Sequence, residues 1–160
     1  MSMLDLQVRE VALERCFELT ALSDEGVAQL KSEWAGAQQV ALHFAPGRWL
    51  LPEPSVALIR AFEASPAATL VDVDGKYRRI LIGGGGAGPA LRSTIALDSV
   101  LGGRRDCAAV TLFDCPTILA RSVSPGTEGY EVWVHASYLA SFTAALDAAR
   151  RRIRLRPQEQ

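Results

Sequence analysis

The sequence has few of the residues from which metal centres and disulfide frameworks are built. It contains 3 cysteines (Cys16, Cys107 and Cys115) and 2 histidines (His43 and His135), which lie far apart. An odd cysteine count without C-x-x-C spacing is typical of neither a disulfide framework nor a zinc site. We therefore predict reduced, mostly buried cysteines and no metal-binding residue. A bond between Cys107 and Cys115 would require their strands to pair in a suitable register.

Long apolar runs and an excess of one charge are also lacking. No stretch reaches the ~18 apolar residues of a membrane span, and the first 16 residues lack a signal-peptide core. These absences predict a cytoplasmic protein without membrane contact. The net charge of −1 predicts no nucleic-acid partner. The basic run 150–156 is typical of a solvated helix end, and contact with phosphate or an acidic partner is the alternative.

Known catalytic arrangements are absent as well. The sequence has no nucleophile elbow and no G-K-[ST] motif, so a P-loop is excluded. Asp72 and Asp74 share one strand face, and no acid from another element is expected opposite them. Ser137 is explained as a helix cap and His135 as the end of a strand. His43 is expected to be a surface or cross-strand residue. We predict no catalytic, cofactor-binding or metal-binding residue.

What the sequence does contain indicates a globular α+β protein. Hydrophobic residues make up 49% and charged residues 22% of the 160 positions, which is a globular composition. This length suits a single domain, residues 1–160, built from two packed halves at approximately 9–74 and 75–156. We expect each half to be ferredoxin-like, with the split β-α-β order and a mainly antiparallel sheet.

Residue spacing defines the elements of the first half. Ser23 precedes apolar residues three and four apart, which predicts a capped helix that ends at Gly36. Pro54 suits the first turn of a second helix. The expected elements are a strand at 11–20, a helix at 24–35, a hairpin of strands 39–44 and 48–51, a helix from 54 to the Ser65-Pro66 break, and a strand at 69–73. This order is β-α-β-β-α-β.

The second half is expected to repeat that order in outline. Asp74-Gly75 predicts a hairpin turn into it. The expected elements are a strand at 77–82, a helix at 89–97, a hairpin of strands 110–114 and 117–123, a loop at 124–129, a strand at 130–134 and a last helix capped by Ser137. Ile153–Leu155 could add a short edge strand.

A glycine run separates the strand at 77–82 from the helix that follows. Gly83, Gly85 and Gly88 satisfy G-x-G-x-x-G, the pattern of dinucleotide sites. A central parallel strand should be almost wholly apolar, but this strand begins Tyr77-Arg78-Arg79. No second parallel strand with an acidic end follows. The residues favour a flexible strand-to-helix turn, with nucleotide binding as the alternative.

Four stretches resemble a known family. They are Pro46–Leu51, Val71-Asp72-Val73 with the strand RRILIGG, Thr111-Leu112 to Leu119-Ala120-Arg121, and Tyr130–Val134 before Ser137-Tyr138. These stretches are similar to the gamma subunit of heterotetrameric sarcosine oxidase, itself a relative of the folate-binding domains of aminomethyltransferases. The glycines at 83–88 depart from the family's single glycine-proline turn.

The resemblance implies a folate-binding-domain-like fold and a non-catalytic role. It implies a cytoplasmic complex that oxidatively demethylates sarcosine to glycine, in which larger flavoprotein subunits are the partners. FAD, FMN, NAD, tetrahydrofolate and zinc would be held by those subunits and not by this chain. An accessory subunit of this kind should expose an apolar patch of several hundred Å².

Two alternatives belong beside that hypothesis. The chain is equally compatible with the corresponding subunit of a related N-methyl amino acid dehydrogenase, because substrate choice would reside in another chain. It could also be a free-standing small-molecule binder with a folate-like cleft. Such a cleft would need convergent polar groups, which we would look for near Arg78, Arg79 and the glycine turn.

Overall fold

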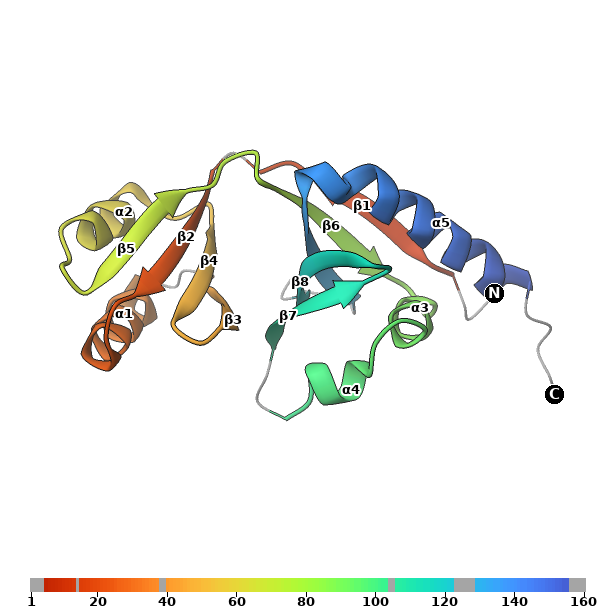
Figure 1. Cartoon of the computed structure of the whole chain (residues 1–160), viewed down its shortest axis with the longest axis horizontal. Helices are drawn as coiled ribbons and strands as arrows, with labels where there is room; N and C mark the ends of the chain where they lie inside the picture. The colour runs from red at the N-terminus through yellow and green to blue at the C-terminus, as the bar shows by residue number, and fades with distance from the viewer. Residues whose placement is uncertain (1–4, 14, 38–39, 104–105, 123–128, 156–160) are drawn as a thin grey trace. The chain divides into compact units, whose positions relative to one another are not determined.

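The computed structural model describes residues 5–13, 15–37, 40–103, 106–122 and 129–155 (Figure 1). Contacts between residues divide the chain into two compact units. One unit is the continuous segment Leu13–Lys76, and the other combines Met1–Ala12 with Tyr77–Gln160. Each unit has one antiparallel sheet and its own helices. The predicted α+β class with mainly antiparallel sheets is confirmed.

The unit Leu13–Lys76 has the split β-α-β order expected from the sequence. Its elements are β2 (Cys16–Ala21), α1 (Asp24–Ala37), β3 (Leu42–Ala45), β4 (Arg48–Pro52), α2 (Val56–Glu63) and β5 (Ala68–Asp72). The sheet order is β3-β4-β2-β5, and every neighbouring pair is antiparallel. The expected hairpin, β3–β4, is confirmed, and the β-α-β-β-α-β order is confirmed with it.

Helix caps and apolar faces explain these elements. The Ser23 side chain accepts a hydrogen bond from the Gly26 amide at 3.0 Å, as the predicted cap requires. Ser55 caps α2 in the same way through Leu58, so α2 begins two residues after Pro54 and not at it. One core forms between helices and sheet. Its buried members are Phe17, Leu19, Leu30, Trp49, Leu51, Leu58, Ile59 and Phe62.

The second unit has a five-stranded sheet. Its elements are β1 (Gln7–Val11), β6 (Tyr77–Gly83), α3 (Ala87–Arg92), α4 (Leu97–Val100), β7 (Cys107–Leu112), β8 (Cys115–Arg121), β9 (Gly129–His135), a 3₁₀ turn η1 (Ala136–Tyr138) and α5 (Leu139–Leu155). The sheet order is β1-β6-β9-β8-β7. The stripe Leu139, Phe142, Leu146, Ala149 and Ile153 on α5 contacts the core of this unit or is buried, as predicted.

The predicted strand at 11–20 is wrong, because two strands from different sheets lie there. β1 pairs with β6, with Val11 opposite Arg79. β2 pairs with β4 and β5 in the other sheet. The mixed apolar spacing of residues 9–20 follows from this change of sheet. The second unit therefore takes its edge strand from the N-terminal segment, which the approximate halves 9–74 and 75–156 did not anticipate. A single domain over residues 1–160 stays a prediction.

Other boundaries also differ from the expected ones. The hairpin expected at 110–114 and 117–123 is formed by β7 and β8, whose closing pair is Leu112 and Cys115, so the turn lies at 113–114. α1 continues through Gly36 to Ala37, so Gly36 does not end it. The expected helix at 89–97 is two short helices, α3 and α4, with a turn between them. Ile153–Leu155 belongs to α5 and is not a strand. Because α5 continues to Leu155, this segment is helical and cannot form the short edge strand that the sequence suggested.

The Asp74-Gly75 turn is present but does not close a hairpin. Gly75 has φ +73°, and Lys76 N–H donates to the Val73 carbonyl at 2.9 Å. β5 before the turn pairs with β2, whereas β6 after it pairs with β1 and β9. The turn thus leads from one unit to the other. In the part of the chain that the structure describes, no helix has the length and apolar character needed to cross a membrane.

Candidate functional site

The glycine run brings the chain close to its own N-terminal segment. Gly84 has φ +83°, and a Cβ placed there would collide with the Asp5 carbonyl oxygen. The same oxygen accepts a hydrogen bond from the Gly86 amide at 3.0 Å. The absence of side chains at this turn therefore allows a close backbone approach, which is one of the ordinary reasons for glycine.

The strand before the glycines is not the parallel strand of a dinucleotide fold. β6 is antiparallel to both of its neighbours, β1 and β9, whereas the dinucleotide fingerprint belongs to a parallel β-α-β unit. Gly84, Gly85 and Gly88 do border a hollow of about 510 Å³, together with Arg92 and Arg121. Both cations of this hollow have partners within the chain.

Arg92 donates two hydrogen bonds to the Asp98 carboxylate, at 3.1 and 3.2 Å. That hydrogen-bonded partner lowers the pKa of Asp98 and raises the pKa of Arg92. Arg121 donates to the Leu101 carbonyl at 2.8 Å. A ligand in the hollow beside the glycines would have to compete with these contacts.

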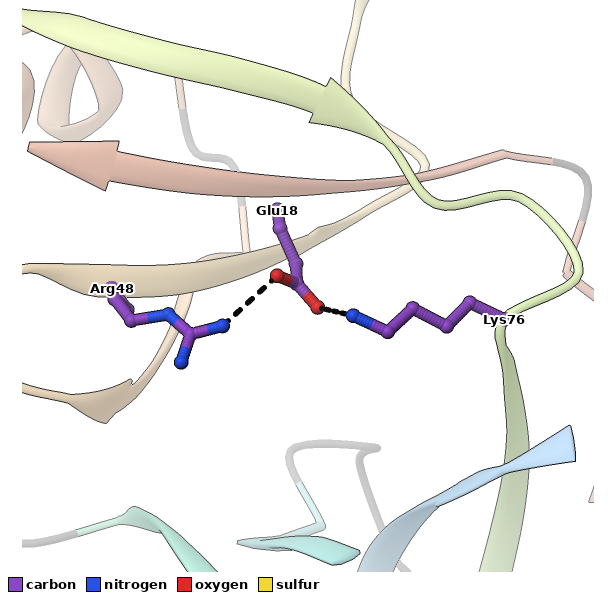
Figure 2. A network of polar contacts seen from close by, with 3 residues as sticks. All are labelled: Glu18, Arg48 and Lys76. Atoms are coloured by element: carbon purple, nitrogen blue, oxygen red, sulfur yellow. Dashed lines mark hydrogen bonds and ion pairs between the residues drawn. The ribbon is translucent and has the colours of Figure 1, made fainter. Parts of the chain in front are cut away.

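A carboxylate with two cationic partners lies on the four-stranded sheet (Figure 2). Glu18 of β2 accepts from Arg48 of β4 at 3.1 Å and from Lys76 at 2.5 Å, one cation on each carboxylate oxygen. Its side chain is 12% exposed. Because each oxygen accepts from a cation, this carboxylate holds the 74–76 turn against the sheet.

A second ion pair lies within the five-stranded sheet. Arg79 of β6 donates to both oxygens of Glu131 of β9, at 2.6 and 3.2 Å. The Glu131 side chain is 3% exposed, and the guanidinium also lies over the Trp133 ring, 5.5 Å from its centroid. This bidentate arrangement is strong and directional. The ion pair connects β6 to β9 on the face of the sheet that carries Trp133.

The Arg79–Glu131 pair lies where a folate-like cleft, near Arg78 and Arg79, would be expected. Successive strand residues project to opposite faces, so these two arginines do not converge. Arg79 is occupied by Glu131, and Arg78 lies 3.9 Å from Glu10 in a half-exposed pair. The polar convergence that a folate-like cleft would need is therefore not formed by these two residues.

The histidines and paired acids have local structural roles. His43 lies opposite Trp49 and stacks on it, with ring centroids 4.7 Å apart, as expected of a cross-strand residue. Partial loss of solvation, followed by the Lys31 charge, lowers the pKa of His43, whose side chain remains exposed. Asp72 accepts from the Asp74 amide at 2.9 Å within the turn.

The cap before the last helix is not the predicted one. The His135 side chain accepts from the Ser137 amide and also lies 2.8 Å from the Ser137 hydroxyl. His135 is therefore the capping residue of η1, and α5 begins two residues after Ser137.

The cysteines are free, as predicted. Cys16 and Cys115 are buried and Cys107 is half-buried. The β7–β8 register places Cys107 opposite Ala120 and Cys115 opposite Leu112, at opposite ends of the hairpin. Burial, followed by neighbouring carboxylates, raises the pKa of Cys16 and of Cys107 to about 12 each. Such thiols are poor nucleophiles at neutral pH.

No metal centre forms among the residues that the structure describes, since none of their His, Cys, Asp and Glu side chains gather in threes. The polar groups that sequence analysis missed are Glu18 and Glu131 with their cations. Charged residues within strands were the available signal, but choosing their partners requires the strand register. Exposed large apolar side chains lie on separate segments: Val8, Leu22, Val40, Val56, Val71 and Tyr138. A contiguous apolar patch stays a prediction.

The fold is similar to that of a known oxidase chain. No protein-family model and no curated protein matches the sequence. Among solved structures, a chain of heterotetrameric sarcosine oxidase from Corynebacterium sp. U-96, in complex with pyrrole 2-carboxylate, superposes with a TM-score of 0.77. The match covers 98% of this chain and 89% of that chain at 18% sequence identity.

A weaker likeness links the chain to an aspartate kinase. The enzyme from Clostridium acetobutylicum has a TM-score of 0.41 at 8% identity, over 90% of this chain and 34% of that chain. This score is too low to indicate a shared fold. The chain thus has the fold of a chain found in heterotetrameric sarcosine oxidase, as the sequence resemblance predicted.

Proposed function

We propose that this chain is the small, non-catalytic gamma subunit of a heterotetrameric, flavin-dependent complex that oxidatively demethylates sarcosine to glycine. The observation that carries the proposal is the fold likeness over 98% of the chain to a chain of heterotetrameric sarcosine oxidase. The agreement extends over both units, and not over one sheet alone. The four sequence stretches that resemble the gamma subunit support it independently.

The chemistry of the polar residues is consistent with an accessory role. The two most buried strand carboxylates, Glu18 and Glu131, are each occupied by cations of the same chain. The thiols of Cys16 and Cys107 are held protonated by burial. The paired carboxylates connect strands of the scaffold, and the protonated thiols are poor nucleophiles. We propose that flavins, NAD, tetrahydrofolate and zinc are held by larger partner subunits in the cytoplasm.

Co-purification tests the assembly. The tagged full-length chain would be co-expressed with the large flavoprotein subunits of the same organism and recovered by the tag. The expected result is a complex of fixed stoichiometry that carries flavin absorbance and consumes oxygen when sarcosine is added. A chain that elutes alone, without flavin, under these conditions would refute the proposed role.

The choice of substrate and acceptor is tested on the same complex. Oxygen consumption with sarcosine supports the oxidase. Turnover only with an artificial electron acceptor, or only with another N-methyl amino acid, would assign the chain to a related dehydrogenase. Titration calorimetry of the isolated chain with tetrahydrofolate and with dinucleotides addresses a free-standing binder, for which heat with either ligand is required.

A further inference from the structure

A groove between two helices of the second unit lies outside every site discussed above. It has a volume of about 670 Å³, within the usual range for small-molecule pockets. One wall is α5, the other is α3 with the segment that follows it, and the β7–β8 turn lies at the groove as well. All of its lining residues belong to one unit.

The wall from α5 is made of small side chains. Ala145, Ala148 and Ala149 line the groove, with Arg152 and Ile153 one turn further along. This spacing of three and four places all five residues on one helix face. The methyl groups leave space that larger residues would fill, so the groove follows directly from the sequence of α5.

The opposite wall is fixed in place. Thr94 Oγ1 accepts a hydrogen bond from the Phe113 amide at 3.1 Å, which ties the β7–β8 turn to the segment after α3. The Phe113 ring packs edge-on against Phe142 of α5, with centroids 5.7 Å apart. The Phe113 and Pro89 side chains give this wall an apolar surface. A preformed wall lowers the entropic cost of binding.

Two charges of opposite sign line the groove. Asp114 lies in the β7–β8 turn and Arg152 lies on α5. Among the described residues, neither Asp114 nor Arg152 has an ion-pair partner. A groove that is lined by alanines, Pro89 and Phe113 and also offers one free carboxylate and one free guanidinium complements a molecule that carries both charges on an apolar body.

We propose that the groove between α3 and α5 binds a small zwitterion with an apolar body, that is, an amino acid whose ammonium group faces Asp114 and whose carboxylate faces Arg152. Arginine is the preferred partner of a carboxylate because its guanidinium can donate two parallel hydrogen bonds. The apolar part of the ligand would lie against Phe113 and the α5 alanines. The site would give the chain a ligand of its own, without requiring the partner subunits.

Calorimetric titration of the isolated full-length chain tests the site. The probes are L-phenylalanine, L-leucine and ε-aminocaproate, which differ in the separation of their charges. Phenethylamine and hydrocinnamate are the matched compounds with one charge each. At least one zwitterion should bind, and it should bind about tenfold more tightly than either singly charged compound. No heat with any zwitterion, or equal affinity for the singly charged compounds, would overturn the proposal.

Matched variants locate the binding. Asp114→Asn and Arg152→Gln should each weaken binding about tenfold, whereas Asp147→Asn and Arg151→Gln, on the exposed part of α5, should leave it unchanged. Ala148→Leu should fill the groove and abolish binding, and Ala144→Leu, one turn earlier and exposed, should not. Thermal unfolding of each variant checks the fold. Equal effects of the groove variants and their controls would place the ligand elsewhere.

Discussion

At the scale of single residues, glycine and cysteine have the clearest physical roles. Gly84 combines a positive φ with the close approach of the Asp5 carbonyl, whereas Gly75 has a positive φ in open space. A side chain at Gly75 would cause backbone strain alone, whereas a side chain at Gly84 would cause strain and a steric collision. Gly84 lies in the glycine run that suggested a nucleotide site, and its geometry is explained by the contact with Asp5 within the chain.

We predict that Gly84→Ala destabilises the protein far more than Gly75→Ala. The Gly75 variant should cost about 1–2 kcal/mol, since an alanine at φ +73° is strained but meets no atom. The Gly84 variant must in addition displace the Asp5 segment, so β1 should detach from β6. Thermal unfolding and hydrogen exchange of the β1 amides measure both effects. Equal melting temperatures for the two variants would contradict the packing role of Gly84.

We predict that the thiols of Cys16 and Cys107 make the fold sensitive to alkali. The folded-state pKa of Cys16 and Cys107 is about 12, above the ordinary value of 9.0. Because the folded state favours the neutral thiol, this contribution is full below pH 9 and is lost as the pH rises toward 12. Chemical denaturation at several pH values should show the loss, and Cys16→Ala/Cys107→Ala should reduce it.

Alkylation provides the corresponding kinetic measurement. Iodoacetamide at pH 8 should leave Cys16 and Cys107 unmodified in the folded protein, because their thiolates are scarcely populated. Mass spectrometry should find all three cysteines modified after unfolding. Rapid labelling of either residue in the folded protein would show that it is accessible and ionised.

At the scale of elements, ion pairs fix particular strands to one another. Arg79 joins β6 to β9 through Glu131, and Arg48 with Lys76 joins β4 and the turn after β5 to Glu18 of β2. In each case a mostly buried carboxylate is the centre. A buried carboxylate must be paired to be tolerated, so removal of one partner from either contact should be costly.

We predict that Glu131→Ala destabilises the five-stranded sheet by about 3 kcal/mol, because it leaves the Arg79 guanidinium without its partner in a mostly buried position. The double variant Arg79→Met/Glu131→Leu should recover most of that loss, since no charge is then buried. Arg78→Met is the neighbouring control. It breaks only a half-exposed 3.9 Å pair and should cost less than about 1 kcal/mol.

Denaturant unfolding of the wild-type protein and the three variants measures these differences in the free energy of unfolding. A double variant as unstable as Glu131→Ala would mean that the pair contributes through specific hydrogen bonds and not through charge compensation. An Arg78→Met variant as unstable as Glu131→Ala would mean that the strand tolerates no change at either position, and the argument from burial would fail.

The sequence predicted elements where local chemistry decides them. Ser23, the apolar spacing of α1 and the strands beside Gly47 indicated a helix and a hairpin that the structure contains. Local patterns could not indicate which sheet a strand joins. Residues 9–20 alternate imperfectly because β1 and β2 belong to different sheets, and only pairing over a long sequence distance separates them. Likewise, neither Arg79 nor Glu131 identifies its partner until the register is known.

At the scale of the whole molecule, one unit is inserted into a hairpin of the other. β1 and β6 are antiparallel neighbours, with Val11 opposite Arg79. The segment Leu13–Lys76 therefore occupies the position of the loop that would join these strands, and it has a core of its own. The N-terminal segment also contributes Leu6, which is 1% exposed, to the core of the second unit.

We predict that replacing Leu13–Lys76 with Asn-Gly leaves a folded second unit. The replacement would place Asn, Gly and Tyr77 between Ala12 and Arg78, a three-residue hairpin loop in the native β1–β6 register. Cooperative thermal unfolding by circular dichroism and protection of the β6 amides measure the outcome. The groove between α3 and α5 lies wholly within this unit, so ligand affinity there should be unchanged.

A chain that begins at Tyr77 is the matched control. It lacks β1 and Leu6, so β6 becomes an exposed sheet edge and the core loses a buried leucine. Burial of that one side chain is worth about 1.5–3 kcal/mol, and the control should be less stable than the hairpin-closed chain by at least this amount. If both shortened chains are unfolded, the second unit depends on Leu13–Lys76 for its stability. If both are equally stable, the pairing of β1 with β6 and the burial of Leu6 make no net contribution to the stability of the second unit.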